Sequence, residues 1–274
     1  MKARTGLELP RIGLGTWRMG EDPRRAAEEV AALRLGLDLG IRLIDTAEMY
    51  GDGGAERRVA EALRGRRDEV QIVSKVLPQN ASRDGTIRAA ERSLRRLETD
   101  RIDLYLLHWA GRHPLEETCA AFERLVAEGK IRHYGVSNFD VDELERAERL
   151  PGGAGVAANQ VLYNLERRGI EHRLLPWCRE REVVVMAYSP LEQGRLRGGS
   201  ALESVARRHG CTPAQVAVAW TIREPGAMTI PKAGRLEHVR EIVEAEALRL
   251  DPADLVELDG AYPRPSRPIP LETA

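Results

Sequence analysis

Four ionisable side chains of different types occur in order along the N-terminal part of the sequence: Asp45, Tyr50, Lys75 and His108. A phenol has a pKa of about 10, so it is a poor proton donor at neutral pH unless a nearby cation stabilises its phenolate. Lys75 can supply that cation, and Asp45 can keep a buried ammonium charged and in place. His108 can hydrogen-bond a substrate oxygen. The set predicts protonation of a substrate oxygen, with Tyr50 as general acid and without a metal.

Each of these residues also has a purely structural interpretation. A buried Asp–Lys pair in a barrel is often structural, and a histidine or tyrosine near the end of a strand is more often a packing residue than a catalytic one. A structural pair formed by Asp45 and Lys75, however, requires neither Tyr50 nor His108. The joint occurrence of all four therefore favours a catalytic interpretation.

The elements that would position these residues alternate along the chain. Eight short apolar runs are separated by amphipathic stretches, such as the one with Ala26, Val30, Leu33 and Leu37 at helical spacing. This alternation is typical of parallel strands joined by crossover helices. The runs span residues 12–15, 41–45, 70–75, 102–108, 133–137, 156–160, 183–189 and 227–231. With 274 residues, the chain is predicted to form an α/β fold, a single-domain (β/α)8 TIM barrel over residues 1–274.

The C-terminal third carries further signals. Residues 202–209 predict an additional helix, and Thr212 followed by Pro213 predicts the start of another. Residues 261–274 are rich in proline, so we expect an irregular tail that crosses the barrel. The alternative of a doubly wound open sheet requires a GxGxxG turn after the first strand, and the segment GLGTWRMG at residues 13–20 does not match it.

Composition restricts the class of ligand. Lys and Arg number 42 and Asp and Glu number 43, so the net charge of −1 gives no reason to expect a nucleic acid or an anionic membrane as partner. Cys119, Cys178 and Cys211 form no CxxC motif, which argues against a disulfide framework and against a zinc site. Neither a signal-peptide pattern nor an apolar run of membrane-spanning length is apparent. We expect a cytoplasmic protein that acts on a small molecule.

Polar residues stand where the predicted strands end. Asp45, Lys75 and His108 end the second, third and fourth runs, and Tyr50 lies in the loop after the second. The later runs end in Ser137, Asn138, Gln160, Tyr188 and Ser189. Because the carboxyl ends of barrel strands form the reactive face, all of these side chains should meet at one rim.

Seven sequence blocks, taken in order, resemble those of the aldo-keto reductase superfamily. They are IDTAEMYG at 44–51, SKV at 74–76, LLHW at 106–109, GKIRHYGVSNF at 129–139, NQVLYN at 159–164, AYSPL at 187–191 and IPK at 230–232. The resemblance is strongest to compact bacterial members that reduce methylglyoxal and similar small aldehydes. It implies a catalytic tetrad formed by Asp45, Tyr50, Lys75 and His108.

The same resemblance implies a nicotinamide cofactor. Ser137, Asn138 and Gln160 would hold its carboxamide, which suits hydroxyl and amide side chains. The ring of Tyr188 would stack on the nicotinamide. Further cofactor contacts are implied for Ser189 and Leu191 of the AYSPL block.

The segment after IPK departs from the family pattern at three places. The family carries Ser or Thr, then Arg and Asn, which engage the 2′-phosphate and the adenine; here those places hold Ala233, His238 and Ile242. Lys232 and Arg235 remain available for a phosphate, and Glu241 stands in its family position. We therefore predict NADP(H) as the preferred cofactor, with NAD(H) as the alternative.

The resemblance also implies the substrate class, namely small aldehydes or α-oxoaldehydes such as methylglyoxal. Trp17, Met49 and Trp109 resemble the apolar wall of the family's pocket. Only residues 110–112 separate Trp109 from the predicted start of the next helix, so we expect an open pocket that favours small carbonyls over steroid-sized ketones. Family members are often monomers, and we expect a monomer.

Two other functions remain open from the sequence. One is a nonenzymatic, cofactor-binding regulatory subunit on the same barrel, although the intact tetrad argues against it. The other is a barrel hydrolase or isomerase, which would be expected to carry paired carboxylates or a metal cluster at the rim. Only Asp45 is clearly present there.

Overall fold

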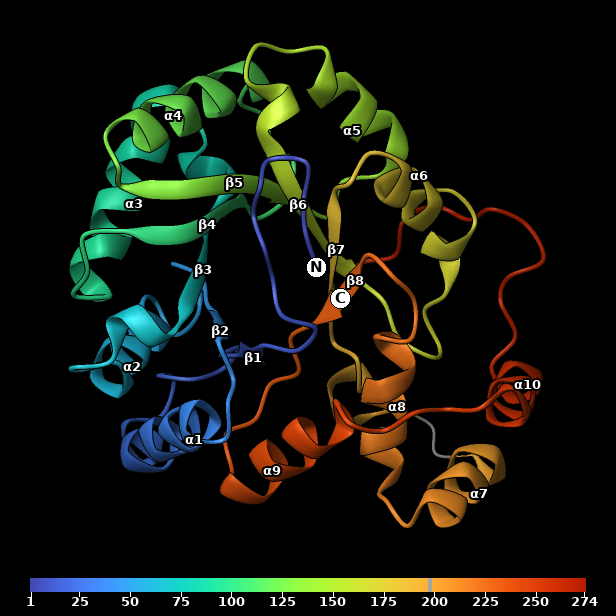
Figure 1. Ribbon diagram of the computed structural model, residues 1–274. Coiled ribbons are helices and arrows are strands. Elements are labelled where there is room, and N and C mark those ends of the chain that lie inside the picture. The colour runs from blue at the N-terminus through green and yellow to red at the C-terminus, as the bar shows by residue number, and fades with distance from the viewer. Residues whose placement is uncertain (197–198) are drawn as a thin grey trace.

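Eight parallel strands form the centre of the protein (Figure 1), as seen in a computed structural model that describes residues 1–196 and 199–274. Each strand pairs with the next along the chain, in the order β1 to β8. The strands are β1 (Leu14–Gly15), β2 (Leu43–Asp45), β3 (Gln71–Val76), β4 (Ile102–Leu107), β5 (Ile131–Ser137), β6 (Val156–Leu162), β7 (Val184–Tyr188) and β8 (Ala227–Thr229).

The sheet closes between its first and last strands. Parallel bridges join Ile12 to Thr229 and Gly15 to Lys232. Across the same seam, the Gly13 amide donates to the Thr229 carbonyl at 2.9 Å. Sequential pairing with closure confirms the predicted (β/α)8 barrel and excludes the doubly wound open sheet.

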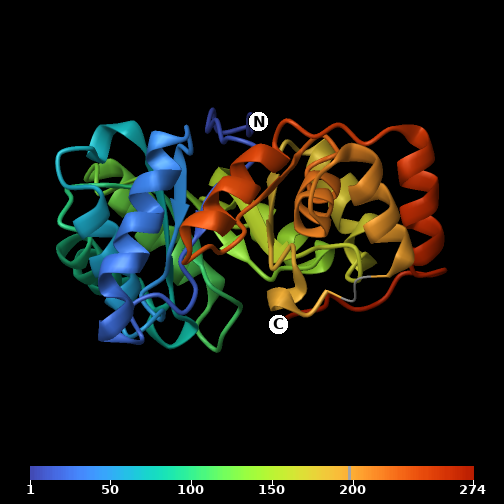
Figure 2. The ribbon, with the colours of Figure 1, turned by 90° about the horizontal axis from the view of Figure 1, so that it is seen from below.

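Helices surround the strands (Figures 1 and 2). Those that follow β1 to β6 are α1 (Ala26–Asp38), α2 (Gly54–Ala62), α3 (Arg83–Arg96), α4 (Leu115–Ala127), α5 (Val141–Glu148) and α6 (Leu174–Glu180). The C-terminal helices are α7 (Ser200–His209), α8 (Pro213–Thr221), α9 (Leu236–Ala245) and α10 (Pro252–Ala261). The predicted additional helix is α7, and Thr212 caps α8 as expected, accepting a hydrogen bond from the Gln215 amide. Among the described helices, none is long and apolar enough to cross a membrane.

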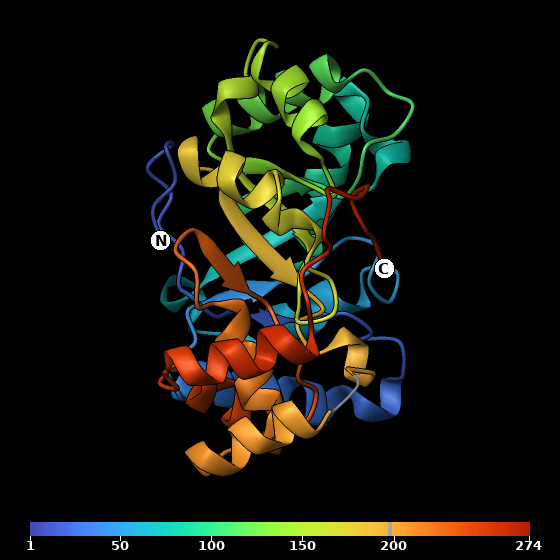
Figure 3. The ribbon, with the colours of Figure 1, turned by 90° about the vertical axis from the view of Figure 1, so that its right-hand side faces the viewer.

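The barrel interior is filled by apolar side chains rather than hollow. One buried cluster contains the inward-facing residues Leu43, Val73, Leu104, Leu106, Ala158, Val184, Met186 and Met228. An N-terminal hairpin, closed by an antiparallel bridge between Lys2 and Glu8, adds Leu7 and Leu9 to this cluster. Figure 3 shows the two termini on opposite sides of the barrel, so the hairpin covers one end and leaves the other end for a site.

The C-terminal tail has no helix or strand after α10, which ends at Ala261, the residue from which an irregular tail was expected. It runs back over the carboxyl ends of the strands. The His172 ring bonds the Pro265 carbonyl (2.5 Å), Arg167 pairs with Glu272 (2.9 Å), and the Ala274 amide donates to the Tyr188 hydroxyl (3.3 Å). The tail therefore forms part of the rim at the carboxyl ends of the strands.

Candidate active site

The two-residue repeat of a strand explains which side chains reach the interior at the rim. Side chains of a strand alternate between faces, so a residue two positions after an inward-facing one also points inward. Asp45 follows Leu43 in this way, and Lys75 follows Val73. The same spacing relates His108, Gln160 and Tyr188 to interior residues of β4, β6 and β7. These five side chains form a polar layer above the apolar filling of the barrel.

Lys75 is at the centre of this layer and is completely buried. Its ammonium donates to both carboxylate oxygens of Asp45, at 2.9 and 2.7 Å, and to the Thr46 carbonyl at 2.8 Å. The Tyr50 hydroxyl oxygen lies 3.4 Å from the same nitrogen. The structure thus brings the predicted carboxylate, ammonium and phenol into one chain of contacts.

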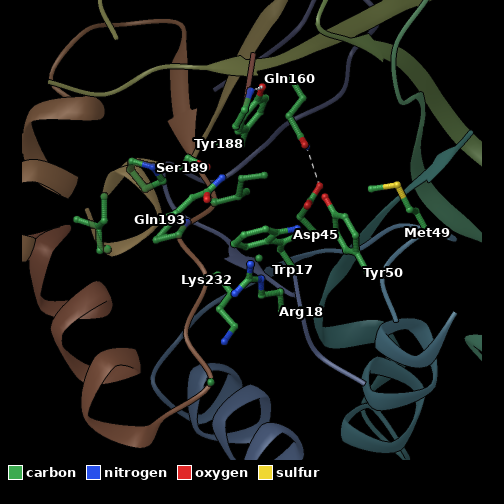
Figure 4. A pocket seen from close by; sticks show the side chains of 18 of the residues that line it. Trp17, Arg18, Asp45, Met49, Tyr50, Gln160, Tyr188, Ser189, Gln193 and Lys232 are labelled. Atoms are coloured by element: carbon green, nitrogen blue, oxygen red, sulfur yellow. Dashed lines mark hydrogen bonds between the residues drawn. The ribbon is translucent and has the colours of Figure 1, made fainter. Parts of the chain in front are cut away.

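The charge state of the Asp45–Lys75 pair follows from its hydrogen bonds. Burial alone lowers the pKa of Lys75, but the Asp45 carboxylate and the Tyr50 phenol outweigh it, so the pKa of Lys75 is raised above its ordinary value. Burial raises the pKa of Asp45 above its ordinary value, and Lys75 and Gln160 offset only part of that shift. Because Asp45 accepts hydrogen bonds on both oxygens, including one from the Gln160 amide at 2.7 Å (Figure 4), the ionised pair is favoured.

Tyr50 reaches the site from the loop between β2 and α2. Gly51 and Gly53 have φ angles of 56° and 76°, and a side chain at residue 51 would stand 2.8 Å from the Met19 carbonyl oxygen. These glycines allow the tight turn that presents the phenol to the cavity. Burial raises the pKa of Tyr50, and the Lys75 charge, which lowers it, offsets only part of that shift. The phenol is therefore protonated at rest, and Lys75 lies where it can stabilise the phenolate that remains when the proton is donated.

His108 lies beside Tyr50, with ring centroids 5.9 Å apart at an interplanar angle of 76°. Burial, and then the Lys75 charge, lower the pKa of His108 to about 3. The imidazole is therefore neutral at physiological pH and has one N–H donor and one acceptor. Its Nδ1 has no hydrogen-bond partner among the described residues. A neutral imidazole of this kind can donate a hydrogen bond to a substrate oxygen.

The side chains predicted to hold the nicotinamide carboxamide are close together and bond one another. Asn138 donates to the His108 carbonyl and to the Ser137 hydroxyl, both at 3.2 Å. The Tyr188 hydroxyl donates to the Asn138 side chain at 2.9 Å, and Gln160 is bonded to Asp45. Asn138 has a left-handed backbone with φ 59°. The group is therefore positioned by its own network, and the link from Gln160 to Asp45 is one that sequence reasoning missed.

A cavity of about 810 Å³ opens above this layer. Tyr50, His108 and Tyr188 line it, with Trp17, Met49 and Trp109 as an apolar wall, as predicted. The predicted cofactor residues Ser137, Asn138, Gln160, Ser189, Leu191, Lys232, Arg235 and His238 also line the cavity. Its volume is within the usual range for cofactor and ligand sites, roughly 300–1,000 Å³.

Two predicted cofactor residues do not line the cavity. The side chain of Ala233 is buried in the core, and Glu241 lies farther along α9 than His238. Sequence reasoning also missed Arg18, Arg25 and Glu28, which come from the segment after β1. Segments that follow the carboxyl ends of barrel strands lie at the reactive rim. The position of these residues after β1 could therefore have identified them as site residues.

The far end of the cavity is positively charged. Lys232 and Arg18 lie on the other side of the Trp17 ring from Gln160 (Figure 4), and the Arg18 guanidinium is 4.4 Å from the centre of that ring. Arg25, Arg235 and His238 also line the cavity, and Arg25 lies close to Lys232 at Gly234. An elongated ligand with a flat ring at one end and an anionic group at the other would match this cavity.

The barrel and the cavity at the carboxyl ends of its strands define the class, a (β/α)8 protein with a ligand-binding cavity at its rim. The chain belongs to the aldo/keto reductase family, whose pattern matches residues 11–263. The methylglyoxal reductase YeaE of Escherichia coli is 52% identical to it over 97% of this chain and 95% of that protein. The glyoxal reductase of Bacillus subtilis is 35% identical over 95% of this chain and 91% of that protein.

Solved structures of aldo-keto reductases are also similar to this chain. An aldo/keto reductase from Klebsiella pneumoniae, crystallised with NADP and acetate, has a TM-score of 0.96 and 50% identity, covering 99% of this chain and 98% of that one. The thermostable aldo-keto reductase Tm1743, in complex with the inhibitor epalrestat, has a TM-score of 0.88 and 40% identity, covering 95% and 98%. The resemblance inferred from seven sequence blocks is thereby confirmed.

Proposed function

We propose that this protein is an NADPH-dependent oxidoreductase that reduces small aldehydes and α-oxoaldehydes, such as methylglyoxal, to alcohols. The observation that carries the proposal is the contact chain from Asp45 through Lys75 to Tyr50, which ends in a protonated phenol at the cavity. The methylglyoxal and glyoxal reductases among the relatives support the substrate class. The Klebsiella structures with NADP and NADPH support the cofactor.

The cavity residues fit a nicotinamide dinucleotide. An aromatic ring (Tyr188) and amide and hydroxyl groups (Asn138, Ser137) suit a flat ring with a carboxamide, and cations at the far end suit phosphates. NADPH, when bound, supplies a hydride to the carbonyl carbon. Lys232 and Arg235 are the residues of the segment after β8 that we assign to the phosphate.

The catalytic assignments concern the proton. Tyr50 donates its proton to the carbonyl oxygen, and the Lys75 ammonium stabilises the phenolate that this leaves. Asp45 keeps Lys75 charged and in place. His108, neutral at its lowered pKa, donates a hydrogen bond to the same carbonyl oxygen and orients it.

The substrate end favours small carbonyls. Trp17, Met49 and Trp109 form its apolar wall, and the tail reaches it through Ala274, which also lines the cavity. Met49 and Trp109 are partly exposed, so the mouth of the pocket is open to solvent. We expect steroid-sized ketones to be poor substrates. Only residues 110–112 lie between Trp109 and the turn that leads into α4, and this short connection leaves an open pocket that favours small carbonyls.

The nonenzymatic alternative finds no support. The matched relatives are named as reductases. Asp45, Tyr50 and His108 line one cavity, and Lys75 is joined to them through its contacts with Asp45 and Tyr50. We also propose that the protein is a cytoplasmic monomer. Its free cysteines, Cys119, Cys178 and Cys211, are consistent with a reducing compartment.

The test is a carbonyl panel assayed with NADPH and with NADH. We expect NADPH consumption with methylglyoxal and other small aldehydes, and a higher kcat/KM for these than for a steroid ketone. NADPH should be preferred over NADH. Failure to turn over any aldehyde, or a steroid ketone that exceeds every small aldehyde in kcat/KM, would contradict the proposal.

A further inference from the structure

Two cations from distant parts of the chain converge on one glycine at the far end of the cavity. A Cβ atom built on Gly234 would lie 3.0 Å from the Lys232 Nζ and 3.1 Å from the Arg25 Nη2. All three residues line the cavity. Because Gly234 has no side chain, the space between the two nitrogens and the backbone stays open to a ligand.

The electrostatics of this space favour an anion. Within the described part of the chain, the Lys232 ammonium forms no hydrogen bond or ion pair. Burial lowers the pKa of Lys232, and Arg25 lowers it further, whereas Glu28 and Glu29 act in the opposite direction. A partly buried ammonium beside a guanidinium is therefore destabilised in its charged form until an anion neutralises both.

Arg25 is free to take part in such binding. It is the last residue of the short 3-10 turn Pro23–Arg25, just before α1. Its one described ion pair is with Glu28 at 3.3 Å, and both side chains are substantially exposed, at 39% and 45%. An exposed pair of this kind contributes little free energy, so exchanging it for a phosphate costs little.

Arg25 also compensates for a departure from the family pattern. The family resemblance assigns the 2′-phosphate to the segment after IPK, where His238 stands in place of an arginine. A guanidinium is always charged and can form two parallel hydrogen bonds to a phosphate, and an imidazole can do neither. Arg25 reaches this segment from the chain between β1 and α1, and its Nη2 would lie 3.1 Å from a Cβ atom on Gly234.

We propose that Arg25, together with Lys232, binds the 2′-phosphate of NADPH and thereby sets the preference for NADPH over NADH. This inference rests on the proposed function, since it concerns the same cofactor site. The 2′-phosphate carries a charge of about −1.5 to −2 at neutral pH, and NADH has a hydroxyl at that position. Loss of Arg25 should therefore weaken NADPH selectively.

The experiment compares Kd values for NADPH and NADH, measured by fluorescence quenching, in the wild type, Arg25→Ala and Arg24→Ala. Arg24 is a matched control because it has the same charge, is 90% exposed, pairs with Asp22 and does not line the cavity. We expect Arg25→Ala to weaken NADPH about 10-fold or more and NADH less than about twofold. Arg24→Ala should change neither Kd more than about twofold. Glu28→Gln, which releases Arg25, should tighten NADPH.

The outcomes separate the inference from the proposed function. Equal weakening of both cofactors by Arg25→Ala would place Arg25 against the shared part of the dinucleotide and overturn the inference. An unchanged NADPH Kd in Arg25→Ala would also overturn it. A wild type that binds neither cofactor would instead contradict the proposed function. Thermal unfolding of each variant establishes that it is folded.

Discussion

The catalytic end of the cavity is buried and densely hydrogen-bonded, whereas the phosphate end is only partly buried and its cations have few partners. Lys75 has no solvent exposure and donates three hydrogen bonds of 2.7 to 2.9 Å, but Lys232 has no described partner and Arg25 has one exposed ion pair. Proton transfer requires fixed geometry within a fraction of an ångström. Neutralising the charge of a phosphate does not require such fixed geometry, so the cation can come from another element of the fold. This difference explains why the sequence keeps the family pattern at one end and departs from it at the other.

The largest effect is expected from Lys75→Met, which removes the ammonium between Asp45 and Tyr50. The variant should lose at least about 10³-fold in kcat, because the phenolate of Tyr50 loses its cation. It should also lose about 3–5 kcal/mol of unfolding free energy, since Asp45 is left buried and charged without its partner. Urea unfolding and single-turnover NADPH oxidation measure the two effects.

A double variant provides the control for Lys75→Met. Adding Asp45→Asn removes the unpaired charge, so part of the lost stability should return while kcat stays low. A Lys75→Met variant that retained a tenth of the wild-type kcat would show that Lys75 is structural only.

The second prediction concerns the pH dependence of stability and isolates His108. Its pKa is about 3 in the folded protein and near 6.5 when unperturbed, so between these values the unfolded chain binds a proton that the folded state does not. Unfolding free energy should therefore fall as pH drops from about 6.5 towards 3, by up to about 2 kcal/mol at pH 5. His108→Asn should lack this part of the loss. Parallel pH profiles of unfolding for the two proteins would contradict the neutral assignment.

The third prediction concerns the C-terminal tail, which reaches the cavity through Ala274. Arg167 pairs with Glu192, next to the cavity residue Gln193, and with Glu272 of the tail, at 3.0 and 2.9 Å. Partly exposed ion pairs are weak, so Arg167→Met should raise the KM for methylglyoxal only about two- to fivefold. Amide exchange in residues 263–274 should become faster.

The control for this prediction removes another surface pair. Arg179→Met breaks the exposed pair with Glu224, far from the tail contacts of Arg167, and should leave tail exchange unchanged. Equal exchange rates in the tail of Arg167→Met and of the wild type would show that the tail is held by its other contacts.

The smallest effect is expected from restoring the family residue at the phosphate end. His238→Arg should tighten NADPH about two- to fivefold and leave NADH almost unchanged, because Arg25 and Lys232 already supply positive charge there. Kd values for both cofactors measure this. If both cofactors bound tighter by the same factor, residue 238 would face the part of the dinucleotide that they share.

Sequence reasoning predicted the barrel and the catalytic end because both follow from local repeats. The apolar runs located all eight strands, and the two-residue alternation within a strand carries Lys75 and Gln160 to the interior. The phosphate end depends instead on how loops from distant strands come together. Arg25 and Lys232 are separated by about 200 residues, and only closure of the barrel between β1 and β8 brings them to the same glycine.

The electrostatics of Tyr50 show a second limit of what the sequence can predict. The sequence indicated a cation near the phenol, which was correct, but it could not weigh that cation against desolvation. Likewise, the hydrogen bond from Gln160 to Asp45 joins side chains of β6 and β2 across the barrel, and no sequence spacing reports such a contact.

The role of Tyr50 as proton donor can be measured in a single-turnover reduction of methylglyoxal by Tyr50→Phe, with NADPH binding determined on the same sample. Tyr105→Phe is the matched control, because Tyr105 is a buried tyrosine that does not line the cavity. Loss of the proton donor should slow reduction at least about 100-fold while the NADPH Kd stays within about threefold of the wild type, and the control should reduce methylglyoxal at the wild-type rate. A Tyr50→Phe variant that retained a tenth or more of the wild-type rate would contradict the assignment of Tyr50 as the acid.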